Sequence, residues 1–341
     1  MGRKNREKYF KTLHQQFHEK LVSLQAFGES RAEDKKCGAD RNKIYSFATY
    51  QTYRRAAMRF VKYVTKEHPE CTTMKKAKRY VNEWLQTRVD AGLSAWTISM
   101  ETSALCKIFG ILPDDPKRFH VPQRRREDIK RSRGEAKRDK HFSMKNNDEL
   151  IKFVCATGTR RSILEKLRGD DLWSRERMEL KLEELSHKES LTDTEAHMKG
   201  LLSEALGTFE EFTFFCLHRQ DKGGKFRFAP IWPENQDLVI RRMTEVAPDE
   251  LVFRTVHSAA DIHFYRAEYA KRIYRYYARD LSSLPYDKFN RGSGKWYQSD
   301  VYICRSDEKG RKLDREALLK ASKALGHNRI DVIPRNYLYG L

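Results

Sequence analysis

The 341-residue sequence lacks the paired cysteines of a zinc site or a disulfide-stapled fold. Its six cysteines are scattered and form no C-x-x-C pair; they stand at positions 37, 71, 106, 155, 216 and 304. A metal ligand set or a disulfide framework is therefore not expected, and a reducing cytosol is the simplest compartment. Cys106, Cys155 and Cys216 lie in apolar runs, so we expect them to be single buried thiols.

Long apolar segments are also missing. No run approaches the length of a membrane span, and the first residues, Met1 to Arg6, lead into no apolar core of a signal peptide. These absences predict a soluble intracellular protein without a membrane partner.

Acidic residues are in deficit. Asp and Glu total 48 against 68 Lys and Arg, which gives a formal net charge of +20. An excess of this size favours a polyanionic partner, usually nucleic acid, over a merely well-solvated surface. Charge alone does not separate DNA from RNA.

The length suits two domains, and the first part of the chain is helical in pattern. Residues 1–42 are predicted to be an N-terminal helical extension that packs on a partner protomer or covers part of the next domain. Residues 43–112 predict a small all-helical DNA-binding domain, in which Ser46 or Thr49 starts the first helix and Ser94 caps the third. We expect its outward basic side chains to contact phosphates. The candidates are Arg54, Arg55, Lys62, Lys75 and Lys76.

Residues 113–142 are rich in helix breakers and basic side chains. Three prolines precede a run of arginines, Arg124, Arg125 and Arg126, which we include among the candidate DNA contacts. This composition predicts an extended interdomain linker. A cationic strap around a duplex and a disordered spacer explain it equally well.

Residues 143–341 predict a second domain that mixes helices with a few strands. Helical patterns cover about 146–156, 161–168 and 259–280, and two apolar strands, 212–217 and 226–231, flank a Gly-Gly turn. A polar region, 173–210, is largely helical with a weak core signal, and 281–312 is strand and loop. Asp314 caps a helix that ends at Gly326, and Pro334 is expected to forbid further helix. The predicted fold class is mainly α with a small antiparallel β-sheet.

Several short stretches of this second domain contain side chains that could bind a phosphate. Arg160 follows a glycine turn and starts a helix, where its guanidinium would add bidentate donors to an N-terminus already polarised toward anions. Lys222 stands at the tip of the Gly-Gly hairpin. His263 and Arg266 are three residues apart on one helical face and could both address one phosphate.

The end of the sequence adds two more polar groups. Leu325-Gly326-His327 ends the last long helix, and Tyr337 follows four residues before the terminus. Each stretch alone is weak, because an arginine after a turn is usually structural and a C-terminal tyrosine usually packs on a surface. Their order and chemistry together are specific.

In this order the motifs resemble the tyrosine recombinase (phage integrase) family. The matching residues are Thr157-Gly158-x-Arg160, Leu164, Leu167, Asp171, Lys222-Gly223-Gly224-Lys225, His263-x-x-Arg266, Leu325-Gly326-His327 and Tyr337. The resemblance spans about 43–341. It implies that 43–112 is a core-binding domain and that 143–341 is a mixed α/β catalytic domain.

The resemblance also implies a reaction and a role for each residue. Arg160 and Arg266 would clamp the non-bridging oxygens of a DNA phosphodiester, and Tyr337 would attack the phosphorus to form a 3′-phosphotyrosyl link. His263 would assist as the general-base group, and Lys222 would protonate the leaving 5′-oxygen as the acid. His327 would form a hydrogen bond with the phosphate.

The partners implied by the resemblance are double-stranded DNA recombination sites, three further protomers of a homotetramer, and possible directionality or accessory proteins. The implied role is integration or excision of a mobile element. No metal or nucleotide cofactor is needed, which agrees with the absence of a metal-ligand cluster or a P-loop. The implied location is the cytoplasm of a bacterium, in association with the nucleoid.

The chain departs from the family pattern at a few positions. Ile163 stands where Glu is usual, and Ala267 stands where His is usual. The ten-residue step from His327 to Tyr337 is one longer than the commonest, which leaves Tyr339 as a rival nucleophile. Arg161 and Lys225 are likewise rivals of Arg160 and Lys222.

Other functions remain open. The same chemistry fits a type IB topoisomerase or a resolvase-like strand transferase. A catalytically decayed DNA- or RNA-binding protein, or a basic structural protein of RNA particles, would explain the charge but not the ordered motifs.

Overall fold

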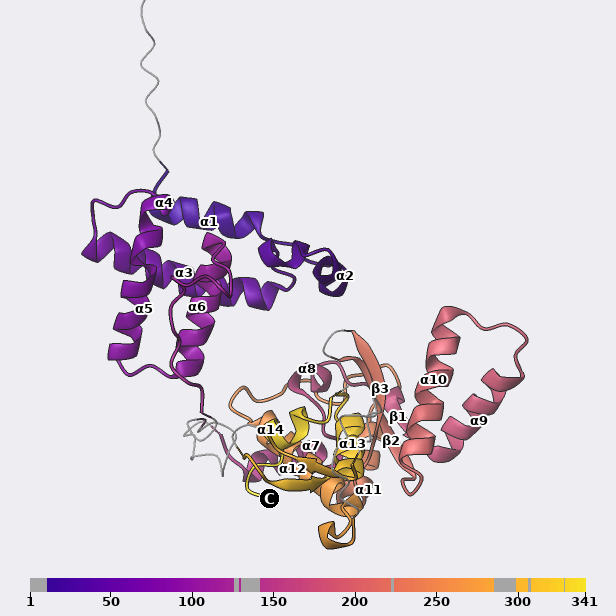
Figure 1. Ribbon diagram of the computed structural model, residues 1–341. Coiled ribbons are helices and arrows are strands. Elements are labelled where there is room, and N and C mark those ends of the chain that lie inside the picture. The colour runs from indigo at the N-terminus through magenta and orange to yellow at the C-terminus, as the bar shows by residue number, and fades with distance from the viewer. Residues whose placement is uncertain are drawn as a thin grey trace, which may run out of the picture. The chain divides into compact units, whose positions relative to one another are not determined.

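The computed structural model describes residues 11–125, 129, 142–221, 224–284, 299–305, 308–327 and 329–341. The chain divides into two compact units, Met1–Asp128 and Ile129–Leu341 (Figure 1). It is mainly helical with small antiparallel sheets, so the predicted fold class is confirmed. Within the described ranges no helix is both long and apolar enough to cross a membrane.

The first unit is built from helices whose starts are set by capping side chains. Ser46 accepts a hydrogen bond from the amide of Thr49, and Ser94 accepts one from the amide of Thr97. Gly110, at φ 63°, ends the last of these helices. The helices are α1 (Leu13–Ser23), α2 (Arg31–Lys36), α3 (Phe47–Glu67), α4 (Met74–Ala77), α5 (Val81–Asp90) and α6 (Ala95–Phe109).

The opening helix α1 is part of the core of this unit. Its buried Phe17 lies 5.8 Å from the ring of Phe60 on α3 and 5.5 Å from the ring of Phe109 on α6. The start of the predicted linker also lies on this core, where Phe119 and Val121 pack. The amide of Asn82 on α5 donates to the carbonyl of Lys117 at 2.9 Å.

The second unit places helices around two small sheets. A three-stranded antiparallel sheet has the order β1-β2-β3, and β4 pairs with β5. The strands are β1 (Leu172–Ser174), β2 (Phe214–Asp221), β3 (Lys225–Pro230), β4 (Val301–Ile303) and β5 (Lys312–Asp314). The helices are α7 (Asp148–Thr157), α8 (Arg161–Leu164), α9 (Arg175–His187), α10 (Asp193–Thr208), α11 (Gln236–Thr244), α12 (Ile262–Tyr277), α13 (Arg315–Ala324) and α14 (Val332–Asn336).

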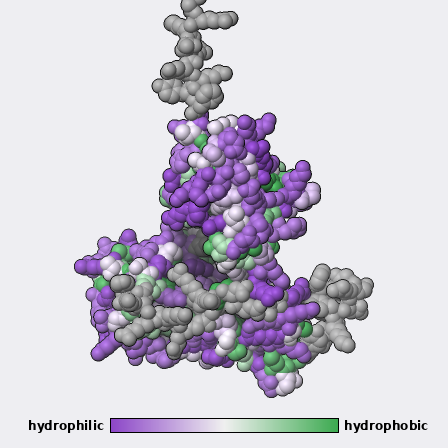
Figure 2. Space-filling model, turned by 90° about the vertical axis from the view of Figure 1, so that its left-hand side faces the viewer, coloured by the Kyte–Doolittle hydropathy of each residue, from purple (hydrophilic) through white to green (hydrophobic). Residues whose placement is uncertain are grey.

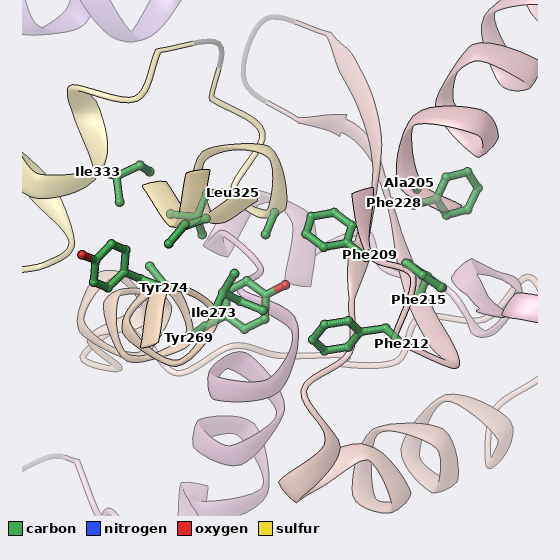
Figure 3. Packing of buried hydrophobic residues seen from close by; sticks show 14 of the residues in the cluster. Ala205, Phe209, Phe212, Phe215, Phe228, Tyr269, Ile273, Tyr274, Leu325 and Ile333 are labelled. Carbon is green, nitrogen blue, oxygen red and sulfur yellow. The ribbon is translucent and has the colours of Figure 1, made fainter. Parts of the chain in front are cut away.

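The polar region 173–210 forms the helix pair α9 and α10, which lies beside the three-stranded sheet (Figure 1). Its core signal was weak because most of its surface is solvated. A sparse set of apolar side chains, including Leu185 and Leu202, is nevertheless fully buried. These side chains join the main core of the unit, which Figure 3 shows from close by: Phe209, Phe215 and Phe228 belong to it together with Tyr269 of α12.

The C-terminal segment differs from the expectation that Pro334 forbids helix. Pro334 is the third residue of α14. The first-turn amides of a helix have no intrahelical acceptor, so a proline there removes no hydrogen bond. Helix α14 ends at Asn336, and Tyr337 follows it with only 5% of its surface exposed. The tyrosine is therefore held inside the unit and is not an exposed phenol on a tail.

Candidate active site

Arg266 is the buried centre of the candidate site. It lies on α12 with 1% of its surface exposed, and its guanidinium donates to the carbonyls of Gly158 and Leu325. Its Nε lies 3.5 Å from the hydroxyl of Tyr337. Burial lowers the pKa of Arg266, whereas the neighbouring Tyr337 acts in the opposite direction. One guanidinium thus contacts the turn after α7, the end of α13 and Tyr337.

The glycine turn that binds Arg266 is shaped for close packing. Gly158 ends α7 at φ 59°, a conformation that favours glycine. A Cβ atom there would overlap the ring of Tyr269. The motif glycine is therefore required by its backbone angle and by the ring beneath it.

The hydroxyl of Tyr337 also contacts His327, whose Nε2 lies 3.1 Å away. Burial and the charges of Arg266 and Arg160 lower the pKa of His327 to about 3. His327 is therefore neutral near pH 7 in this DNA-free structure. A neutral imidazole can serve as either donor or acceptor to the phenol.

His263 also contacts the phenol ring. Its imidazole is exposed and stacks on Tyr337 with ring centroids 5.2 Å apart and planes inclined by 14°. It occupies the helix turn before Arg266, so the i, i+3 spacing does bring both residues to the tyrosine.

Arg160 caps the start of α8 in an extended conformation and forms an ion pair with buried Asp221 at the end of β2. It also lines a cavity of about 560 Å³ together with His263, Arg266 and Tyr337. Four of the six predicted catalytic residues, Arg160, His263, Arg266 and Tyr337, thus share one cavity, and His327 touches its tyrosine.

Two of the three rival residues, Arg161 and Tyr339, have other partners. Arg161 lines the same cavity, but its guanidinium donates to backbone carbonyls of the loop before α12, including those of Val256, His257 and Ala260. The ring of Tyr339 lies 4.6 Å from Nζ of Lys271, and it is Tyr337 that lines the cavity. The geometry favours Arg160 and Tyr337 over both rivals.

Lys222 and Arg126 lie outside the described residues. Lys225, the alternative to Lys222, is exposed at the start of β3 and lines a second cavity of about 380 Å³ next to Asp221. The two departures from the family pattern are core positions here, since Ile163 and Ala267 are both fully buried.

Three polar residues near this site are not among those predicted from the sequence. Asp221, Arg227 and His218 are buried on the β2–β3 hairpin. Nε of Arg227 lies 3.5 Å from the carboxylate of Asp221, and its Nη2 lies 2.6 Å from Nδ1 of His218. The signal that could have revealed them is an arginine between two apolar strand residues, because charged residues are seldom buried without a partner.

In the first unit the candidate DNA contacts lie mainly on the surface. Arg55, Lys62, Lys75, Lys76, Arg124 and Arg125 are exposed, and Arg54 is half-buried. Arg55 and Lys62 follow one face of α3 together with Arg59, which pairs with fully buried Glu101 at 2.8 Å. Arg124 lies over the ring of Trp96 at 4.9 Å. Figure 2 shows a largely hydrophilic molecular face with small, separate hydrophobic groups.

The described residues offer no three His, Cys, Asp or Glu side chains that could together hold a metal ion. The groups that the site does offer are guanidinium donors, imidazoles and a phenol. Such a set suits an anionic oxygen ligand such as a phosphate.

Comparison with known proteins gives only distant structural similarity. No protein-family model matches the chain, and no curated protein matches its sequence. The chain is similar to the XerH site-specific recombinase bound to palindromic difH substrate in a post-cleavage complex, with a TM-score of 0.46, 14% identity, and coverage of 95% of this chain and 90% of that one. The pre-cleavage complex of XerH with difH gives a TM-score of 0.44 and 14% identity, with coverage of 95% of this chain and 91% of that one.

Proposed function

We propose that this protein cuts and rejoins DNA strands as a site-specific tyrosine recombinase. The observation that carries the proposal is the position of one hydroxyl. The phenol oxygen of Tyr337 lies 3.5 Å from Nε of Arg266 and 3.1 Å from Nε2 of His327, beside a cavity that Arg160 also lines.

The chemistry follows from these groups. A phosphodiester in the cavity would receive hydrogen bonds from guanidinium donors, which stabilise the extra negative charge of the transition state. Removing one such donor costs about 10²- to 10³-fold in rate. Tyr337 would attack the phosphorus, the bond to the 5′-oxygen would break, and the strand would remain attached through a 3′-phosphotyrosyl bond. Attack by a 5′-hydroxyl of another strand would reverse these steps and free the tyrosine.

The cleavage reaction also requires two proton transfers. The tyrosyl proton must leave as the phosphorus is attacked, and the adjacent His263 and His327 are the candidate acceptors. The leaving 5′-oxygen must gain a proton, and we assign this role to Lys222 of the β2–β3 hairpin. No metal or nucleotide takes part in the proposed steps.

The biological setting is part of the proposal. The substrate would be paired recombination sites in double-stranded DNA, bound by four protomers, and the role would be integration or excision of a mobile element in a bacterial cytoplasm. The basic face of α3 would hold the duplex through its phosphates. Accessory or directionality proteins would select the direction.

A covalent-trapping experiment tests the proposal. Labelled, nicked duplexes from the DNA that flanks the coding region, together with a pool of randomised duplexes, are incubated with the protein. We expect an adduct that resists SDS and is removed by protease, formed by the wild type and by Tyr339→Phe but not by Tyr337→Phe. If Tyr337→Phe forms as much adduct as the wild type, Tyr337 is not the nucleophile. If no duplex gives an adduct, the protein binds DNA without catalysis.

The same adduct would form in a type IB topoisomerase. A supercoiled plasmid that lacks a recombination site separates the two activities. A topoisomerase would relax this plasmid, whereas a site-specific recombinase would leave it supercoiled.

A further inference from the structure

Arg227 is a buried arginine that the proposed reaction does not use. It lies on β3 opposite His218 of β2, and only 7% of its surface is exposed. Burial is the main cause that lowers its pKa, to about 9, and the charge of Arg266 adds to this effect. It therefore carries its charge near pH 7. A buried charge is costly unless each of its donors has a good partner, so its contacts indicate why it is retained.

The first contact is with the end of α13. Nη1 of Arg227 donates to the carbonyl of Ala324, and Nη2 of Arg266 donates to the carbonyl of Leu325 at 2.6 Å. The last carbonyls of a helix lack intrahelical partners and form its negative end. Two guanidiniums therefore bind two consecutive carbonyls immediately before Gly326 and His327.

The second contact is with Gly326 itself. This glycine has φ 68°, and a Cβ atom on it would lie 2.5 Å from Cδ and 2.6 Å from Nε of Arg227. The arginine side chain thus passes directly against the backbone that leads to His327. The amide of His327 also donates back to the carbonyl of Ser322 at 2.9 Å, which closes the turn.

The third contact links Arg227 to Arg160. Both guanidiniums donate to the same carboxylate oxygen of Asp221, which is 4% exposed. Arg160, Arg227 and Arg266 outnumber this carboxylate, and Arg161 also lines the cavity, so the site carries an excess of positive charge. A phosphodiester undergoing attack approaches two negative charges, so an excess of positive charge stabilises the transition state more than the singly charged substrate.

We propose that Arg227 is a positioning residue, which holds the end of α13 so that His327 meets the hydroxyl of Tyr337, and that Asp221 fixes it relative to Arg160. The inference rests on the proposed strand-cleavage function. It implies that the β2–β3 hairpin, which also carries Lys222, and the tyrosine are aligned through one buried network. Displacement of a catalytic group by about 1 Å can cost about 10²-fold in rate.

The test compares Arg227→Met with Arg242→Met. Arg242 is the control because it is a half-buried arginine that, like Arg227, donates to a backbone carbonyl, that of Val252 at 2.7 Å; its guanidinium lies over the ring of Phe253. We expect Arg227→Met to slow single-turnover cleavage about 10- to 100-fold with DNA affinity within about threefold, and Arg242→Met to leave both nearly unchanged. Equal slowing by both variants would overturn the proposal, since it would reflect only lost stability.

A double-mutant cycle separates positioning from general destabilisation. If Arg227 acts through His327, then adding Arg227→Met to His327→Ala should slow cleavage by no more than about twofold beyond His327→Ala alone. Multiplicative losses would contradict the proposal.

A third measurement does not depend on catalysis. The imidazole resonance of His327 in isotope-labelled protein, assigned with His327→Gln, should titrate at a higher pH in Arg227→Met than in the wild type, because a buried cation is gone and the histidine is less confined. An unchanged titration would refute the positioning role. If wild type forms no DNA adduct while this titration does shift, the strand-cleavage function fails and the positioning contact stands.

Discussion

The hydroxyl of Tyr337 and Nε2 of His327 are 3.1 Å apart although the residues are ten positions apart in the chain. The intervening residues include the short helix α14, whose end brings the tyrosine back to the turn that follows α13. The extra residue of this step, relative to the commonest spacing of the family that the motifs resemble, is therefore accommodated without displacing the tyrosine from the histidine. The contact also joins the candidate nucleophile to a histidine that is neutral near pH 7.

Acid should destabilise the second unit through His327. Its pKa is lowered to about 3 in the folded protein, mainly by burial, against about 6.5 when unfolded. The unfolded chain therefore binds more protons between these values, so the free energy of unfolding falls as the pH drops from about 6.5 toward 3. Urea unfolding of His327→Gln across this range should show a shallower fall than the wild type, and the exposed-site control His14→Gln should follow the wild type. A wild-type slope in His327→Gln would contradict the prediction.

Arg266→Lys should impair both stability and cleavage. A lysine amine is a single point of charge and cannot span the carbonyls of Gly158 and Leu325 and the hydroxyl of Tyr337. We expect a loss of about 1–3 kcal/mol in the free energy of unfolding from unpaired buried groups, and a cleavage rate about 10²- to 10³-fold lower.

The control for that prediction is Arg272→Lys on the same helix. Arg272 pairs with Glu234 at 2.8 Å near the surface, so the exchange should cost less than about 1 kcal/mol. Urea unfolding and the rate of adduct formation measure both variants. A cleavage rate for Arg266→Lys equal to that of Arg272→Lys would remove Arg266 from the site.

Gly158→Ala should lower stability by about 2–5 kcal/mol. About 1–2 kcal/mol comes from the left-handed backbone conformation and about 1–3 kcal/mol from overlap with the ring of Tyr269. Gly200→Ala is the matched substitution, because Gly200 lies inside α10 with open space at its Cβ position. It should instead raise stability by about 0.5–1 kcal/mol. Thermal unfolding of both variants checks the opposite signs, and equal effects would refute the conformational argument.

DNA binding should depend on the basic face of α3. Replacing exposed Arg55 and Lys62 together by alanine should reduce the slope of log affinity against log salt by about 1.8, because each lost phosphate contact removes about 0.9. Lys11→Ala is the control, since Lys11 is exposed and already paired with Glu19 at 2.7 Å. Fluorescence anisotropy at several salt concentrations gives the slopes. An unchanged slope in the double variant would move the DNA contact elsewhere on the protein.

Local chemistry decided the elements that were predicted well. Ser46, Ser94 and Asp314 accept hydrogen bonds from amides two or three residues ahead, so the helix starts follow from the sequence itself. The hairpin of β2 and β3 follows in the same way from two apolar runs around paired glycines. The motifs also predicted members of the site, because Arg266, His327 and Tyr337 come from the stretches singled out in the sequence.

Tertiary structure decided the rest, for a physical reason. The partners of Arg227 are a carboxylate at the end of β2, a histidine on the facing strand and a helix end nearly a hundred residues away, and no local pattern encodes such contacts. Whether a polar side chain is buried depends on which elements close over it. For the same reason Phe17 of α1 joins the core of the first unit, Tyr337 lies inside the second, and Arg160 is held by Asp221, since each position is set by packing between segments distant in the chain.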